Sequence, residues 1–96
     1  MVRVIIERRP KQGKEREMWN LLHELRRQGL PRLGYISGET LMGHHDPSLW
    51  VVIATWLSAE HWQDWVNSPE RKDLIAKIEP LLDVPAKTTV LEFPRN

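Results

Sequence analysis

One run with almost no polar side chain restricts how this chain can fold more than any other segment. Residues 49–57, LWVVIATWL, are apolar or aromatic at every position except Thr55. A run of this length that is rich in β-branched and aromatic residues indicates a strand. Because alternate residues of a strand point to opposite faces of a sheet, apolar side chains are expected on both faces.

A strand with apolar side chains on both faces needs both faces of the sheet to be shielded from water. Helices on one side of an antiparallel sheet leave the other side facing water, and that side is then normally polar. The strand therefore predicts a homodimer in which a second copy of the sheet packs face to face against the first. Burial of such a face, at roughly 25 cal/mol per Å², would supply a large share of a small domain's stability. The alternative is a monomer whose strand is simply hydrophobic.

The rest of the chain shows strand and helix patterns in a regular order. Further strands are expected at residues 2–9, 34–43 and 87–93, and a first helix between the first two strands. A second helical segment, broken in two at Ser68, lies between residues 57 and 87. The order β-α-β-β-α-β predicts an α+β fold of the ferredoxin-like type, with a four-stranded antiparallel sheet and its helices on one face. Residues 1–96 are expected to form a single domain.

The helix ends carry recognisable signals. Ser58 and Ser68 are expected to be N-caps, with Pro69 at the first position of the last helix. Gly29, followed by Pro31, is expected to end the first helix in a left-handed conformation.

Composition excludes several classes of function. The formal net charge is +1 with both signs interspersed, so no basic stripe for nucleic acid is expected. The absence of Cys excludes disulfides, thiol catalysis and thiolate metal sites. No apolar run approaches the roughly 20 residues of a membrane helix, and no signal-peptide pattern opens the sequence. A cytoplasmic protein without a membrane partner is expected.

The segment GHHD, residues 43–46, invites comparison with a metal site. Adjacent residues of an extended segment point to opposite sides, so His44 and His45 are poorly placed to share one ion. A turn that holds no metal is the better interpretation.

The middle of the chain resembles the central signature of the antibiotic biosynthesis monooxygenase (ABM) domain family. The resemblance covers residues 46–82, DPSLWVVIATWLSAEHWQDWVNSPERKDLIAKIEPLL. The shared features are a hydrophobic strand that ends in Trp, a Ser with an acidic residue, a helical Trp, and SPE at the start of the next helix. The resemblance implies a dimeric α+β barrel with a pocket between sheet and helices in each protomer. It also implies aromatic polyketides or haem as ligands.

The resemblance assigns roles to two residues of the helical segment. Trp65 falls where a helical Trp lines the pocket, and its indole could stack on a planar substrate and donate a hydrogen bond to a quinone-type oxygen. His61 falls near a polar pocket residue of the cofactor-free members and could take a proton from an acidic phenol or anthrone. The alternatives are a core Trp and an exposed His. Arg71 replaces a hydroxyl-bearing aromatic of that branch and is interpreted as a solvated charge.

The same resemblance argues against haem degradation. The haem-degrading branch uses an Asn on the first strand and a His ten residues beyond the helical Trp, where this chain has Ile6 and Ile75. Ile6 is instead expected to contact a ligand. The remaining aromatic residues could wall an apolar cavity or fill the core: Trp19, Trp56 and Trp62.

Two functions follow from this resemblance. The first is a cofactor-free monooxygenase that deprotonates an aromatic or quinol-like substrate to a carbanion, which passes one electron to O₂ without a metal or flavin. The second is a non-catalytic dimeric module that binds a small hydrophobic ligand.

Overall fold

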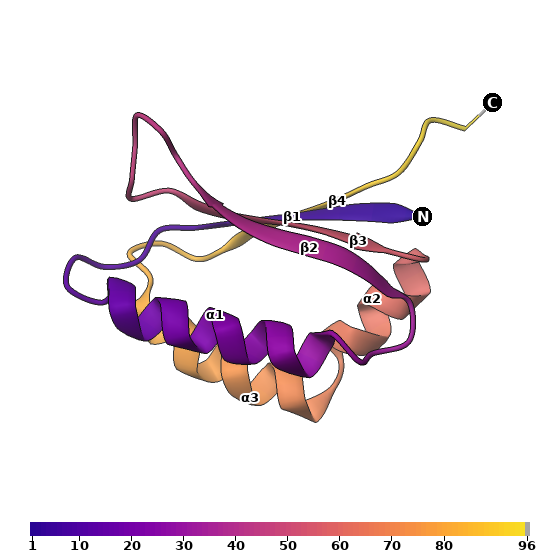
Figure 1. The fold of residues 1–96 in the computed structure, drawn as a ribbon, viewed down its shortest axis with the longest axis horizontal. Helices are drawn as coiled ribbons and strands as arrows, with labels where there is room; N and C mark the ends of the chain where they lie inside the picture. The colour runs from indigo at the N-terminus through magenta and orange to yellow at the C-terminus, as the bar shows by residue number, and fades with distance from the viewer. Residues whose placement is uncertain (96) are drawn as a thin grey trace.

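A computed structural model describes residues 1–95 of the chain (Figure 1). The strands are β1 (Val2–Arg8), β2 (Tyr35–Met42), β3 (Trp50–Trp56) and β4 (Lys87–Leu91), and the helices are α1 (Glu15–Gly29), α2 (Ala59–Val66) and α3 (Pro69–Ile78), followed by the 3₁₀ helix η1 (Glu79–Leu81). The predicted order of elements is confirmed, including the break of the second helical segment into α2 and α3.

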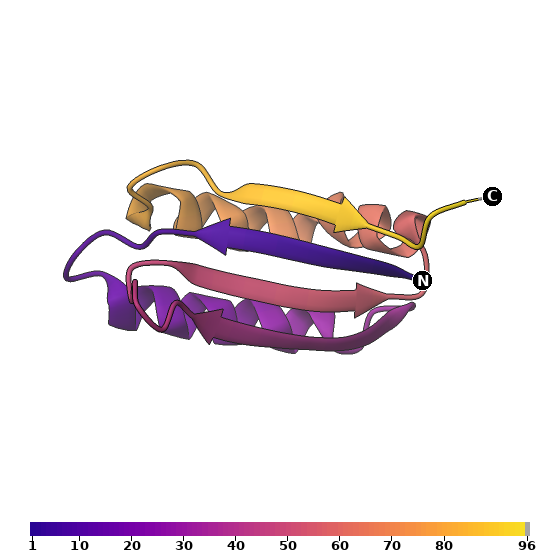
Figure 2. The same ribbon diagram turned by 90° about the horizontal axis from the view of Figure 1, so that it is seen from above.

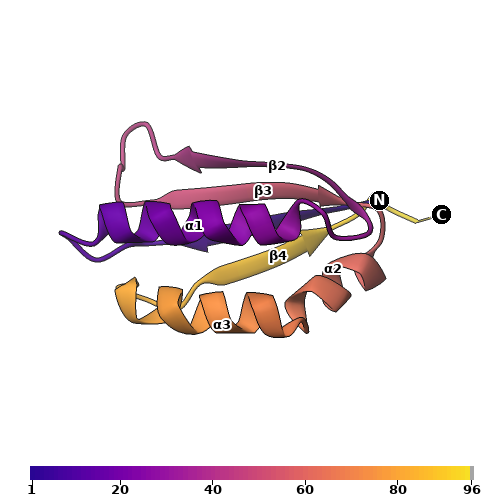
Figure 3. The same cartoon turned by 60° about the horizontal axis from the view of Figure 1, so that its bottom comes forward.

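The strands form one antiparallel sheet in the order β2-β3-β1-β4 (Figure 2). The helices lie on a single face of this sheet (Figure 1). Helix α1 runs under the β2 and β3 side, whereas α3 runs under the β4 side (Figures 2 and 3). The ferredoxin-like α+β arrangement predicted from the sequence is therefore confirmed.

Two serines begin the short helices as expected. The Ser58 hydroxyl accepts a hydrogen bond from the backbone N–H of His61, and the Ser68 hydroxyl accepts one from the backbone N–H of Arg71. Both satisfy N–H groups that a helix start otherwise leaves without a partner. Pro69 occupies the first turn of α3, where its missing N–H is harmless.

The prediction for Gly29 is wrong. Gly29 lies within α1, and the only glycines with positive φ among residues 1–95 are Gly13 and Gly34. Gly29 matters for another reason: a Cβ placed there would lie 3.4 Å from the indole of Trp65. Because Gly29 has no side chain, α2 can pack closely on the end of α1. Local sequence signals cannot reveal such a contact between two elements.

The core lies between the sheet and the helices. Alternation on β1 directs every second residue toward the helices, and these are the buried ones: Val2, Val4, Ile6 and Arg8. One cluster joins β1 and β3 to α2 around Trp56, which is 1% exposed. A second cluster joins α1 to α3 and η1 around Met18 and Ile78.

No element among residues 1–95 covers the opposite face of the sheet (Figure 1). Register places Ile53 between Ile5 on β1 and Glu39 on β2. Ile5 and Ile53 are half-buried by their neighbours alone, and Arg3 is a charged neighbour on the same face of β1. The open face is therefore apolar at its centre and charged beyond it, rather than uniformly apolar.

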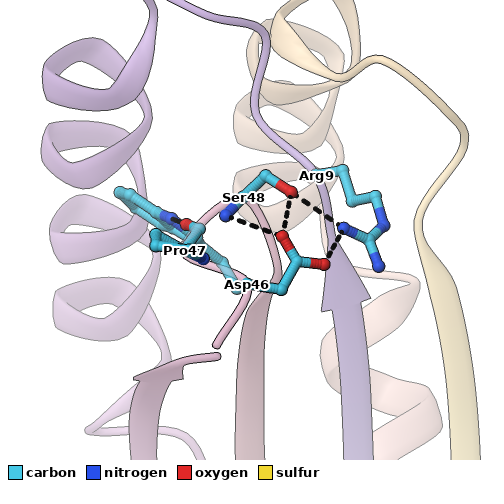
Figure 4. Close-up of polar contacts among 5 residues, drawn as sticks. Arg9, Asp46, Pro47 and Ser48 are labelled. Atoms are coloured by element: carbon cyan, nitrogen blue, oxygen red, sulfur yellow. Dashed lines mark hydrogen bonds and ion pairs between the residues drawn. The ribbon is translucent and has the colours of Figure 1, made fainter. Parts of the chain in front are cut away.

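The loop between β2 and β3 is held to the end of β1 by a polar network (Figure 4). Arg9 Nη1 donates to Asp46 Oδ2 at 2.8 Å and to Ser48 Oγ at 2.9 Å, and Ser48 Oγ donates to Asp46 Oδ1 at 2.6 Å. The GHHD segment is thus a bend in this loop, as expected. Within residues 1–95 no group of His, Asp or Glu side chains is arranged to hold a metal ion, and no described helix is long and apolar enough to cross a membrane.

Candidate functional site

A cavity of about 510 Å³ lies between α3 and η1 on one side and β1 and β4 on the other. Its lining includes Ile6, Arg8, Arg71, Ile75, Glu79 and Thr88. We call this cavity the arginine pocket. The resemblance to the ABM family implies a pocket between sheet and helices that Trp65 lines, and Trp65 is not among the residues around this cavity.

Arg8 forms the inner, charged part of the arginine pocket. It continues the inward alternation of β1, so its side chain enters the interior, and it is only 2% exposed. Its Nε and Nη1 atoms are buried and have no hydrogen-bond partner. Among residues 1–95 no carboxylate forms an ion pair with Arg8.

Arg71 approaches the same pocket from α3. Its guanidinium carbon lies 5.1 Å from the ring centroid of Trp62, a distance typical of a cation–π contact. Its Nε is buried without a partner, like that of Arg8. The interpretation of Arg71 as a solvated charge is therefore wrong, because the phase of α3 turns this position toward the sheet.

The two guanidiniums influence each other. Burial first, and the positive charge of Arg71 second, lower the pKa of Arg8 to about 10. Burial also lowers the pKa of Arg71. Arginine normally keeps its proton at neutral pH, and a value near 10 still leaves Arg8 charged there. The pocket therefore places two positive charges beside aliphatic walls.

Two positions singled out by the resemblance meet in the pocket. Ile6 and Ile75 both line it, from β1 and α3 respectively. Contact of Ile6 with a ligand stays a prediction. Neither side chain carries an atom that could bind iron.

The aromatic residues lie elsewhere. Trp56 and Trp62 pack edge to face in the core, with ring centroids 5.9 Å apart. Trp65 is 5% exposed and packs against Gly29, while the more exposed Trp19 contacts Trp50. None of these rings lines the arginine pocket, although Trp62 contacts the guanidinium of Arg71, one of its lining residues.

His61 is also outside the pocket. Its Nδ1 lies 2.6 Å from Ser58 Oγ, and its ring covers Gly34, where an added Cβ would lie 2.4 Å from its Cγ atom. The catalytic roles expected for Trp65 and His61 stay predictions.

Sequence reasoning missed both arginines. The signal for Arg8 was present, because it shares the parity of Val2, Val4 and Ile6 along β1. A signal for Arg71 was also present, because it precedes Leu74, Ile75 and Ile78 by three, four and seven residues and so shares their face of α3.

A second hollow of about 540 Å³ lies beside the ends of β1 and β4, around Arg3, Thr55 and Phe93. Phe93 is 87% exposed, and this hollow contains no buried charged side chain. Its polar lining side chains, Arg3, Thr55 and Glu92, are not buried, so it lacks the enclosed polar groups of the arginine pocket.

Known structures share this fold. A conserved protein from Methanosarcina mazei Go1 is 19% identical, with a TM-score of 0.90 over 94% of this chain and 89% of its own. Rv0793 from Mycobacterium tuberculosis is 20% identical, with a TM-score of 0.88 over 99% and 96% of the two chains. SnoaB from Streptomyces nogalater, described as a cofactor-independent oxygenase, is 12% identical, with a TM-score of 0.83 over 99% and 95%. At these identities the likeness shows the fold alone.

Sequence comparison gives the family. No curated protein matches the sequence. The model of the family described as antibiotic biosynthesis monooxygenase matches residues 1–77, which is most of the chain. The chain therefore belongs to the antibiotic biosynthesis monooxygenase family.

Proposed function

We propose that the protein is a cofactor-independent monooxygenase that oxidises a small aromatic or quinol-like molecule in the arginine pocket. The observation that carries this proposal is a cavity of about 510 Å³ with aliphatic walls and two charged guanidiniums, in a member of this family. Ligand pockets of small molecules typically measure about 300–1,000 Å³ and combine apolar walls with a few polar groups.

The reaction balances without a further reactant for an anthrone-type substrate. A ring methylene loses a proton, the carbanion passes one electron to O₂, and the two radicals combine to form a C–O bond. Loss of water from the resulting hydroperoxide leaves a ketone, so that CH₂ and O₂ become C=O and H₂O. Positive charge from Arg8 and Arg71 would stabilise the anion that forms first, and the carboxylates of Glu79 and Asp83 in the lining are available proton acceptors.

Oxygen consumption tests this proposal. Purified, metal-free protein is incubated with a panel of anthrones and quinols while dissolved O₂ is followed. Ile75→Phe, which fills the pocket, should slow consumption, whereas Ala76→Phe on the exposed adjacent position of α3 should not. Absence of O₂ consumption by the wild-type protein across the panel would sink the proposal.

The second candidate function is a non-catalytic module that binds a small hydrophobic ligand. The observation in its favour is that Trp65 and His61 do not line the arginine pocket. Ligand binding without O₂ consumption would support this alternative. If turnover is seen, Trp65→Phe tests the expected hydrogen-bond donor, since unchanged turnover would remove Trp65 from the mechanism.

A homodimer formed through the open faces of two sheets is part of the same proposal. The half-buried Ile5 and Ile53 at the centre of that face support it. Ile53→Arg should yield monomers in sedimentation equilibrium, whereas Leu33→Arg, at a position 81% exposed in the loop after α1, should not change the mass. A wild-type monomer at micromolar concentration would contradict the homodimer.

A further inference from the structure

The arginine pocket contains an unusual electrostatic arrangement. Two guanidiniums from distant parts of the chain meet in one cavity, and three of their nitrogen atoms are buried without a partner: Nε and Nη1 of Arg8, and Nε of Arg71. In the described part of the chain, neither side chain belongs to an ion pair. Glu79 and Asp83 also line the pocket, but both are exposed residues.

Such an arrangement is unfavourable by itself. Buried charges are normally paired, and buried donors normally have acceptors. Burial and the charge of Arg71 both act against the protonated form of Arg8 and lower its pKa. A ligand that brought negative charge into the pocket would offset the cost of the two uncompensated charges.

Arg71 is positioned for this task before any ligand binds. Its guanidinium lies over the ring of Trp62, which is itself 7% exposed and fixed against Trp56. The backbone N–H of Arg71 is held by the Ser68 hydroxyl at 3.2 Å. Fewer rotamers are then left to lose on binding, which favours affinity.

We propose that Arg8 and Arg71 together bind an anionic oxygen group, a carboxylate or a phenolate, of an otherwise apolar aromatic ligand. The planar forks of the two guanidiniums match such groups, which accept hydrogen bonds on two or more lone pairs. The apolar body of the ligand would lie against Ile6, Ile75 and Ile78. This inference rests on the proposed function in that it takes the arginine pocket as the ligand site, and it names the class of molecule that enters.

Calorimetric titration with matched probes tests the inference. The probes are naphthoate, a nitronaphthol ionised at neutral pH, the neutral isostere naphthamide, and inorganic phosphate. We expect one or both organic anions to bind roughly ten- to a hundred-fold more tightly than naphthamide, because hydrogen bonds to charged groups are the stronger ones. The tighter of the two anions identifies carboxylate or phenolate as the preferred group.

Variants connect the binding to the two arginines. Arg71→Gln should weaken anion binding by roughly ten-fold and leave naphthamide unchanged, with Arg8→Met acting in the same direction. Lys72→Gln, the neighbouring exposed cation on α3, is the matched control and should change neither. Circular dichroism verifies that each variant is folded, and the two arginine positions serve as independent tests.

Three outcomes would overturn the inference: equal affinity for naphthamide and both anions, unchanged anion binding in folded Arg71→Gln and Arg8→Met, or phosphate bound as tightly as naphthoate. Oxygen consumption separates this inference from the proposed function. Arginine-dependent anion binding without any O₂ uptake would leave the inference standing and the oxygenase proposal refuted. Turnover that is indifferent to both arginine substitutions would do the reverse.

Discussion

Replacing Arg8 by Met is expected to stabilise the unliganded protein. Burial and Arg71 lower the pKa of Arg8 to about 10, and at about 1.4 kcal/mol per pKa unit this corresponds to roughly 3 kcal/mol against the charged form in the fold. Met keeps an unbranched stem that can follow the same path, and it removes both the charge and the unpartnered donors. Replacement of buried ionic groups by apolar ones of similar volume is often stabilising, so we expect a gain of about 1–3 kcal/mol.

Thermal unfolding followed by circular dichroism measures this gain. For a domain of this size, 1 kcal/mol shifts Tm by about 4–8 °C, so Arg8→Met should unfold roughly 5–20 °C above the wild type. Arg16→Met is the control, since Arg16 is an exposed arginine of α1 that lies off the open face of the sheet. Its effect should stay within about 0.5 kcal/mol, as for most surface substitutions.

The pH dependence gives the same prediction a second test. Below pH 10 both the folded and the unfolded chain keep Arg8 protonated, so the penalty in the wild type is fully present. Above that value the folded protein releases the proton before the unfolded chain does, and wild-type stability relative to Arg8→Met rises with pH. The advantage of the variant should therefore shrink as pH rises above about 10. A folded Arg8→Met protein that unfolds several degrees below the wild type would refute the reasoning, because Arg8 would then have stabilising partners.

Three other predictions concern stability. Gly34→Ala should lower the free energy of unfolding in urea by more than about 2 kcal/mol, because Gly34 has φ of +89° and the new Cβ would meet the ring of His61. Gly13→Ala should lower it by only about 1 kcal/mol, because Gly13 has a similar φ of +87° but open space around it. Equal losses would show that the His61 contact is irrelevant. Ser68→Ala should lose about 1 kcal/mol by the same method through the N-cap of α3, and an unchanged midpoint would argue against that cap. Hydrogen bonds from Ser48 and Arg9 lower the pKa of Asp46, so the small contribution of this carboxylate to stability is present at neutral pH and is lost as pH falls. Asp46→Asn should therefore slightly reduce the loss of stability at acidic pH in unfolding measurements. A larger loss at acidic pH would contradict this.

Local patterns accounted for most of the fold. The caps at Ser58 and Ser68 depend on contacts within four residues, so sequence signals suffice to place α2 and α3. Strands β1 and β3 were recognisable because alternation and β-branched content are also local properties. Gly29 shows the limit of this reasoning: it stays helical, and its lack of a side chain serves the close approach of Trp65 from another element, which no local pattern encodes.

The candidate site divides in the same way. Ile6 could be placed by the resemblance and by its parity on β1, and the structure puts it in the arginine pocket. The meeting of Arg8 with Arg71 could not be foreseen, because a charged residue is taken to face water unless its surroundings are known.

The amino-acid sequence by itself determined the order of strands and helices, the inward parity of β1 and the apolar character of both faces of β3. The tertiary structure alone decided which charged side chains are buried away from solvent. Burial is a property of the packed assembly: Arg8 is enclosed only because α3 and η1 close over that end of β1, and Arg71 joins it only because the phase of α3 turns it inward. The chemistry of the pocket is therefore set by contacts between segments that are far apart in the chain.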